Sequence, residues 1–171
     1  MRSSFEPKWH VVYTRPKLER LISTQIYKMG FETYLPLYTV IKQWSDRKKK
    51  IEVPLFPNYI FVKIHGHQRC SILGIYGLVS FVSVEKKPVI LPDNQINTIR
   101  KIMNSDFDVA VDDYFQKGQK IKIIKGQFTD LEGIIIRKNK NFRLLIQINA
   151  LHKALSVNIH AGIAKILKEV G

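Results

Sequence analysis

The sequence predicts two domains of different fold class, an α/β domain over residues 1–104 and a small all-β barrel over residues 117–171. Strand-like and helix-like segments alternate in the first stretch, whereas the second shows short strand patterns, evenly spaced turns and no clear helix. Between them, residues 105–116 carry four Asp and no Lys or Arg. This acidic stretch is expected to be a linker, with a surface loop of one larger domain as the alternative interpretation.

The first domain is expected to open with a strand at residues 9–13, where β-branched and aromatic residues cluster. A helix follows, with Thr14 as its N-cap, Pro16 in its first turn and Gly30 just past its end. Its apolar residues recur at helical spacing and form one stripe: Leu18, Leu21, Ile22, Ile26 and Met29.

The rest of this domain is expected to complete an antiparallel sheet with flanking helices, related to the split β-α-β pattern. The basic run at residues 42–50 is assigned to the solvated tip of a long hairpin. The remaining expected elements are strands at residues 31–41 (bent at Pro36), 51–53, 55–64 and 78–84, a short helix at 68–75, and a helix that begins at Pro92 and carries Ile96, Ile99, Ile102 and Met103.

Residues 118–124, at the start of the second domain, alternate apolar and polar residues with period two, which is typical of a half-buried strand. About fifty residues with short strand patterns, evenly spaced turns and no clear helix predict a small barrel. Its five expected strands are residues 118–124, 133–137, 142–148, 155–158 and 164–167.

The formal net charge is +14, from 28 Lys and Arg against 14 Asp and Glu. Such a balance favours polyanionic partners, nucleic acid first and a membrane surface second, although a basic protein that is merely soluble would share it. No apolar run approaches the roughly 18–20 residues that span a bilayer, and the N-terminus has no signal-peptide pattern. The expected protein is soluble, cytoplasmic, monomeric and without a membrane partner.

Catalysis, cofactors and metals find no support in the sequence. The single cysteine, Cys70, excludes an intramolecular disulfide and has no evident His and acid partners. His65 and His67 have no third ligand nearby, so an exposed loop is expected there rather than a metal site. No Gly-rich phosphate loop or pair of catalytic carboxylates stands out. No enzyme and no cofactor are therefore predicted.

Three segments, taken in order, resemble the NusG family of transcription elongation factors. Residues 9–13 (WHVVY) resemble the first strand of its N-terminal domain, and residues 126–133 (GQFTDLEG) lie in a stretch that resembles the KOW motif. Residues 55–62 (LFPNYIFV) look closest to the specialised RfaH and UpxY antiterminators. The ordered set covers nearly the whole chain and is far more specific than any one segment.

This resemblance implies a factor whose N-terminal domain binds the clamp helices of RNA polymerase and suppresses pausing and termination. Specialised members promote processive transcription of few, long operons, often for surface polysaccharide, and some read the nontemplate DNA strand; nascent RNA is the other candidate determinant. The KOW domain of such factors recruits a ribosomal protein or a termination factor.

Carried onto this chain, the resemblance implies an apolar polymerase-binding patch, since aromatic anchors supply most interface energy. Its members are Tyr13, Phe56, Pro57, Tyr59 and Phe81, flanked by Ile96 and Ile99. A purely structural role in the core is the alternative for all of them. Gln68 and Arg69 align with a short motif that touches the polymerase gate loop in the RfaH subgroup, but this chain lacks that subgroup's His-Thr-Thr.

Two groups of residues are candidates for nucleic-acid contact. The first lies on or beside the first helix, where specialised members touch DNA: Arg15, Gln25 and Lys28. The second lies in the basic hairpin, where one aromatic is interleaved with cations: Trp44, Arg47, Lys48, Lys49 and Lys50. A solvated helix face and a solubility loop are the alternatives. Phe128, in the first loop of the barrel, is a candidate for partner docking or for plugging the barrel end.

Two other function classes remain open. A ribosomal or RNA-binding KOW protein would need the barrel and basic arms, but it leaves the first domain unexplained. A nucleic-acid-modifying enzyme with a KOW appendage would need a catalytic constellation that the sequence does not offer.

Overall fold

The computed structural model describes residues 6–44, 46–104, 109–112, 119–123, 132–138, 141–148, 151, 153–159 and 167–169. By their internal contacts the residues fall into two compact units, 1–94 and 95–171, each described here by itself. Among the described residues, no helix has the length and apolarity needed to cross a bilayer.

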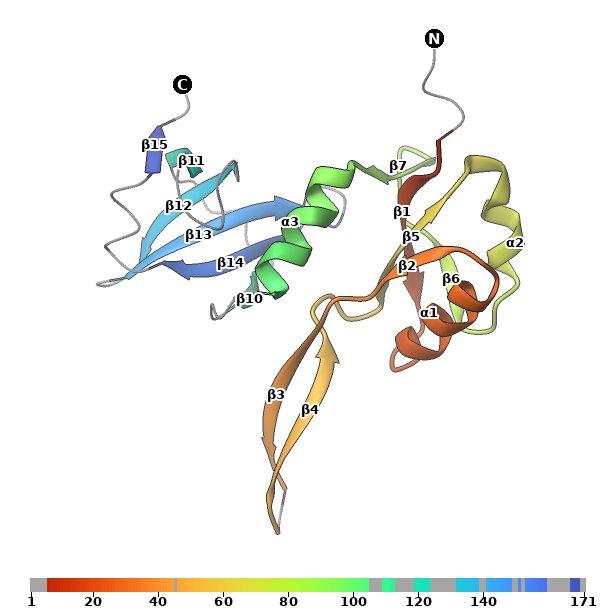
Figure 1. Ribbon diagram of the computed structural model, residues 1–171, viewed down its shortest axis with the longest axis horizontal. Coiled ribbons are helices and arrows are strands. Elements are labelled where there is room, and N and C mark those ends of the chain that lie inside the picture. Colours follow the sequence, from red (N-terminus) through yellow and green to blue (C-terminus); the bar gives the residue numbers. More distant parts are fainter. Residues whose placement is uncertain are drawn as a thin grey trace. The chain divides into compact units, whose positions relative to one another are not determined.

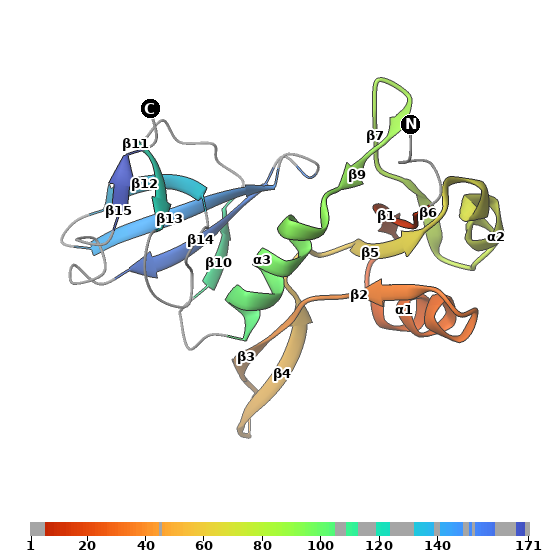
Figure 2. The same cartoon turned by 45° about the horizontal axis from the view of Figure 1, so that its top comes forward.

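An antiparallel sheet organises the first unit, and its central strand is β1 (Lys8–Thr14). One edge of β1 pairs with β5 (Tyr59–Ile64), and β5 pairs in turn with β2 (Glu32–Tyr34). The other edge pairs with β6 (Leu78–Phe81), labelled in Figure 1, and with β9 (Ile90–Leu91), labelled in Figure 2. The first strand of the chain is thus the middle of the sheet, between β5 on one side and β6 and β9 on the other.

Two helices cover one face of this sheet, α1 (Glu19–Lys28) and α2 (Arg69–Leu73), the latter preceded by the 3₁₀ turn η1 (Gly66–Gln68). Ile22 and Ile26 of α1 and Ile72 of α2 are fully buried against this face. The sheet contributes alternate residues to the same core: Val12, Ile60, Val62, Ile64 and Leu78. Each such buried side chain stabilises the fold by about 1.5–3 kcal/mol.

The start of α1 differs from the sequence prediction. Thr14 is the last residue of β1 and is fully buried, so it does not cap the helix. The helix begins at Glu19, whose acidic side chain in the first turn suits the positive end of the helix dipole. Gly30 is confirmed just past the end of the helix, with a φ of 87° that glycine adopts without a steric penalty.

A long two-stranded hairpin leaves this sheet, formed by β3 (Leu37–Gln43) and β4 (Lys48–Pro54) (Figure 1 and Figure 2). Pro36 interrupts the strand expected at residues 31–41 and separates β2 from β3. The buried Pro36 accepts a hydrogen bond from the backbone N–H of Leu55 at 2.8 Å, which closes the base of the hairpin. The return strand is longer than expected and includes the three consecutive lysines.

The short strands β7 (Ser83–Val84) and β8 (Lys87–Pro88) form a small ribbon before β9. The sequence analysis merged β7 with β6 and missed β8 and β9. Helix α3 (Asp93–Met103) begins where Pro92 predicts, and its Ile96, Ile99 and Ile102 are buried.

The second unit holds a six-stranded antiparallel sheet in the order β10-β14-β13-β12-β11-β15. Its strands are β10 (Val109–Asp112), β11 (Gln119–Ile123), β12 (Glu132–Lys138), β13 (Asn141–Ile148), β14 (Lys153–Ile159) and β15 (Leu167–Glu169). The first four expected strands correspond to β11, β12, β13 and β14, whereas the fifth, expected at residues 164–167, overlaps β15 only at Leu167, and residues 164–166 lie outside the described residues. Closure of the sheet into a barrel stays a prediction.

Part of the acidic stretch forms an element that the sequence analysis did not expect. Residues 109–112 make up β10 and pair with β14, so they belong to the sheet of the second unit. The role of residues 105–116 as a linker between independently folding domains stays a prediction.

Gly77 is a position where only glycine fits. Its φ is 88°, and a Cβ built there would lie 2.5 Å from Cδ1 of Leu18 and 3.3 Å from Cδ1 of Ile22. Gly77→Ala should therefore lower the free energy of unfolding by about 2 kcal/mol, through backbone strain and overpacking together. Equilibrium denaturant unfolding measures this change.

Gly74, at the end of α2, provides the matched control. Its φ is −76° and a Cβ there would meet nothing within 4 Å. Gly74→Ala should change the stability by less than about 1 kcal/mol. Equal losses for the two variants would contradict the steric argument at Gly77.

Candidate functional site

A tight turn at residues 55–58 leads into β5 and is fixed by three hydrogen bonds. Asn58 adopts a φ of 71°, and its backbone N–H donates to Oε1 of the buried Glu19 at 2.9 Å. The carbonyl of Asn58 accepts from the backbone N–H of Thr14, and the carbonyl of Phe56 accepts from that of Tyr59. The turn is therefore tied to both β1 and α1, so that Pro57 is presented on a rigid frame.

An exposed apolar surface forms beside this turn. Tyr13 and Tyr59 are direct cross-strand partners, with their rings 5.4 Å apart in an edge-to-face arrangement. Tyr13 is 37% exposed, Tyr59 is half-buried and Pro57 is exposed. We call Tyr13, Pro57 and Tyr59 the aromatic surface.

Of the other residues predicted for the same patch, Phe56 and Phe81 are not part of this exposed surface, and Ile96 and Ile99 belong to the second unit. Phe56 is fully buried and packs edge-to-face on Phe61 at 5.9 Å. Phe81 pairs with Val12, one residue away from Tyr13, so it lies on the opposite, helix-covered face of the sheet. Ile96 and Ile99 of α3 are buried. These side chains contribute packing here and little exposed surface.

The candidates around α1 are all exposed. Arg15 lies between β1 and α1, where its backbone N–H donates to the carbonyl of Gly77 and its guanidinium sits 5.6 Å from the ring centre of Tyr76. Tyr76 is itself 70% exposed. Gln25 and Lys28 are exposed on α1 three residues apart, which places them on one face of the helix.

The β3–β4 hairpin concentrates positive charge with one aromatic. Its tip is closed by a hydrogen bond from the backbone N–H of Trp44 to the carbonyl of Arg47, and the ammonium of Lys49 lies 5.0 Å from the Trp44 ring centre. Lys42 is directly opposite Lys49. Like charges placed opposite one another are destabilising in a sheet, so an anionic ligand would relieve this repulsion.

A salt bridge connects the β3–β4 hairpin to helix α1. Arg20 of α1 forms an ion pair with Glu52 of β4 at 2.9 Å, and its guanidinium also donates to the carbonyl of Glu52. Both side chains are more than half exposed, so the pair adds little stability and instead orients the hairpin base.

The two predicted gate-loop residues make local bonds. Gln68 accepts a hydrogen bond from the backbone N–H of His65 through its side-chain oxygen, and Arg69 donates from Nε to the carbonyl of Gly66. Because Arg69 uses Nε for this hydrogen bond, its two terminal nitrogens have no hydrogen-bond partner among the described residues.

His65 and His67 stack on one another, and the described residues contain no cluster of three metal-ligating side chains. Phe128 lies outside the described residues.

His10 is a polar group that the sequence analysis did not single out. It is 3% exposed on β1, and its Nδ1 has no hydrogen-bond partner. Burial lowers the pKa of His10, and the nearby charges of Arg69 and Lys8 lower it further, although a hydrogen bond with the Val89 backbone acts in the opposite direction. The period-two pattern of β1 places His10 on the same face as Val12, which was the one available signal that it points inward.

The lowered pKa makes the stability of this protein sensitive to acid. Because the folded state disfavours protonated His10, its contribution is fully present above the unfolded-state pKa of 6.5 and is lost as the pH falls from there through the folded-state pKa. The free energy of unfolding should therefore decrease below about pH 6.5. Denaturant unfolding at a series of pH values measures this slope.

The control for the acid effect is His10→Gln, which keeps a polar side chain but does not titrate. Its stability should be lower at neutral pH and should depend less on pH between 6.5 and 5. An identical pH dependence in the two proteins would assign the acid sensitivity to other groups.

Comparisons with known proteins agree with the arrangement of elements. The family model described as transcription termination factor nusG matches residues 7–100. The chain is similar to the transcription termination/antitermination proteins NusG of Lactococcus lactis (23% identity, 91% of each chain covered) and of Buchnera aphidicola (23% identity, 93% of this chain and 96% of the relative).

A solved structure of Thermotoga maritima NusG superimposes with a TM-score of 0.53 and 20% identity, and it covers 99% of this chain and 100% of the other. That likeness concerns the fold. Because the family model spans more than half of the 171 residues, the chain belongs to the NusG family of transcription termination/antitermination factors.

Proposed function

We propose that this chain is a specialised elongation and antitermination factor of the RfaH/UpxY type, which binds the clamp helices of RNA polymerase through the aromatic surface. The observation that carries this proposal is the Tyr13–Tyr59 cross-strand pair beside the exposed Pro57. Rigid aromatic side chains that are exposed in the free protein are the residues that most often dominate binding energy.

The geometry supports binding with little rearrangement. Both tyrosines lie on paired strands of the central sheet. The backbone of the turn that carries Pro57 is fixed by hydrogen bonds to the Thr14 backbone and to the Glu19 side chain. A preorganised surface loses less conformational entropy on association than a mobile one. In this proposal Phe56 supports the turn as a buried side chain and does not itself contact the polymerase.

The basic groups complete the proposal. The exposed cations of the hairpin would attract the nontemplate DNA strand or nascent RNA without regard to sequence, because they meet phosphates. Gln25 would supply sequence preference on α1, since an amide can read a base edge, and Lys28 on the same helix face and Arg15 before the helix would contact phosphate or a flipped base. The targets are then selected long operons, such as those for surface polysaccharide, and the second unit would recruit a ribosomal protein or a termination factor.

The first test concerns the aromatic surface. Tyr59→Ala should weaken binding to RNA polymerase elongation complexes by about 2 kcal/mol, because a central aromatic anchor is removed. Tyr27→Ala is the matched control: Tyr27 is 72% exposed on α1 outside the aromatic surface, and its loss should leave binding unchanged. Affinity is measured on folded variants. Undiminished binding of a folded Tyr59→Ala protein would refute the assignment.

The second test separates non-specific electrostatic attraction of nucleic acid by the hairpin from sequence recognition by α1. Replacing Lys48, Lys49 and Lys50 by Ala should weaken recruitment to all nontemplate sequences and reduce the slope of log affinity against log salt by about 2. Gln25→Ala should cost about 1–3 kcal/mol on the cognate element only. Recruitment to paused complexes with different nontemplate strands measures both effects. Sequence-independent recruitment by the wild-type protein would exclude α1 as a reader.

A ribosomal or RNA-binding role is the alternative function, and affinity capture distinguishes it from polymerase binding. If affinity capture of the full chain retained ribosomal subunits and no polymerase, the polymerase proposal would be replaced by that role.

A further inference from the structure

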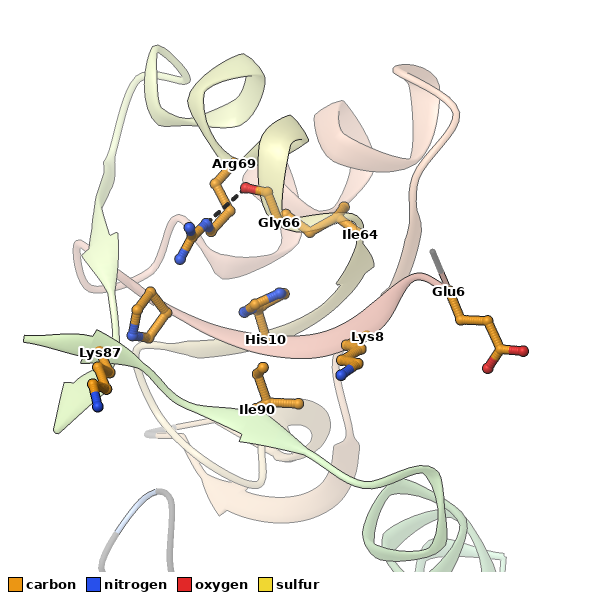
Figure 3. Close-up of a pocket in the computed structure, with 9 residues that line it drawn as sticks. Glu6, Lys8, His10, Ile64, Gly66, Arg69, Lys87 and Ile90 are labelled. Atoms are coloured by element: carbon orange, nitrogen blue, oxygen red, sulfur yellow. Dashed lines mark hydrogen bonds between the residues drawn. The ribbon is translucent and has the colours of Figure 1, made fainter. Parts of the chain in front are cut away.

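A pocket of about 490 Å³ opens in the first unit where four separate segments meet: the start of β1, the end of β5, the turn η1 with α2, and the β8–β9 segment (Figure 3). Its volume falls in the range of small-molecule sites. The residues that line it are Glu6, Lys8, His10, Ile64, Gly66, Arg69, Lys87, Pro88 and Ile90.

Positive charge dominates this lining. Lys8, Arg69 and Lys87 surround the pocket, and none of the three forms an ion pair with a described acidic side chain. Glu6 is the one acidic residue of the lining, and its carboxylate points away from His10 (Figure 3). Three cationic residues thus share one lining that holds no described ion-pair partner for them.

Two of the polar groups are held in place by the fold. Arg69 donates from Nε to the carbonyl of Gly66 at 2.8 Å, which fixes the guanidinium and leaves its terminal nitrogens for a ligand. His10 lies in the middle of the lining, 97% buried, and its Nδ1 has no partner. Buried polar atoms are almost always hydrogen-bonded, so an unpartnered nitrogen in a cationic pocket points to a missing ligand atom.

We propose that this pocket binds a phosphate monoester, with its phosphoryl group on the terminal nitrogens of Arg69, one oxygen on Nδ1 of His10, and the charges of Lys8 and Lys87 adding attraction from the rest of the lining. A dianionic group with three terminal oxygens can accept from Arg69 and His10 together and gains from all three positive charges, whereas a planar, singly charged carboxylate can be satisfied by Arg alone. The apolar part of the lining, Ile64, Pro88 and Ile90, is available to the organic portion of the ligand.

The site couples ligand binding to proton uptake. The Arg69 and Lys8 charges disfavour protonation of His10, and a bound dianion offsets these charges, so a filled site favours the protonated imidazole. Glu6 and Lys87 are the other charged groups of the lining. Affinity should therefore rise as the pH is lowered from 8 towards 6. Inorganic sulfate, which keeps its two charges over this range, is the probe that isolates the protein's contribution.

The test is calorimetric titration of the full chain with inorganic sulfate, inorganic phosphate and adenosine monophosphate, together with NMR of the His10 imidazole. We expect saturable binding, tightest for the monoester, and a rise in the pKa of His10 when the site is filled. Arg69→Gln and Lys87→Ala should each weaken binding about tenfold or more. Lys101→Ala, which removes an equal charge from an exposed position outside the pocket, should change affinity less than twofold.

The source of the phosphate is distinguished by two oligonucleotides of one sequence, with and without a 5′-phosphate. Tighter binding of the phosphorylated strand, lost in Arg69→Gln, would assign the site to a nucleic-acid end. Preference for the free nucleotide over both strands would assign it to a small metabolite. Equal binding of both strands that is unchanged by Arg69→Gln would reflect general attraction and would count against the proposal.

Loss of the fold is excluded within the same experiment. In Arg69→Gln without ligand, the pKa of His10 should rise, because a neighbouring positive charge is gone while the histidine stays buried. A folded wild-type protein that binds none of the three probes, or that binds acetate as tightly as the monoester, would overturn the proposal.

Discussion

The register between β1 and β5 is the constraint on which the rest of the first unit depends. Six consecutive pairs, from Lys8 with Ile64 to Tyr13 with Tyr59, fix which side chains face the helices. Because side chains alternate along a strand, a slip of one residue would exchange the two faces completely. The same register therefore places Val12 and Val62 in the helix-covered core, Tyr13 and Tyr59 on the other face, and His10 at the pocket.

The buried carboxylate of Glu19 connects this register to the turn before β5. It receives the backbone N–H of Asn58, which would otherwise be left without a partner at the end of a tight turn. A buried carboxylate is stable only when its oxygens are hydrogen-bonded, so helix and turn require one another. The position of Pro57 thus depends on α1 as well as on the sheet.

Local patterns were sufficient to predict most of the elements. The run of β-branched and aromatic residues in β1, the period of α3 after Pro92, and the polar tip of the hairpin each predicted the observed element, because these patterns depend on neighbours in the chain. The predicted start of α1 was wrong because the hydrogen bond from the Thr14 backbone N–H to the Asn58 carbonyl keeps Thr14 in the strand. Asn58 is 44 residues away in the sequence, so no local pattern could indicate this bond.

The site was predicted less completely, since its geometry depends on register. Phe81 was expected beside Tyr13, but an irregularity in the β1–β6 pairing between Tyr13 and Thr14 shifts the register, and Phe81 faces the helices. Phe56 and Tyr59 differ by three residues in sequence, and only the turn geometry shows that one is buried and the other half-exposed. The pocket around His10 was not foreseen, because its lining comes from segments that only the folded sheet brings together.

The facing lysines of the hairpin have a further consequence for the protein in a crowded cell. A two-stranded ribbon that projects from its sheet has unpaired backbone edges, and such edges readily add a strand from another molecule. Lys42 opposite Lys49, and Lys50 opposite the exposed Ile41, make two ribbons of this kind repel one another before their edges can meet. The charge that would attract a polyanion also protects the free chain from edge-to-edge aggregation.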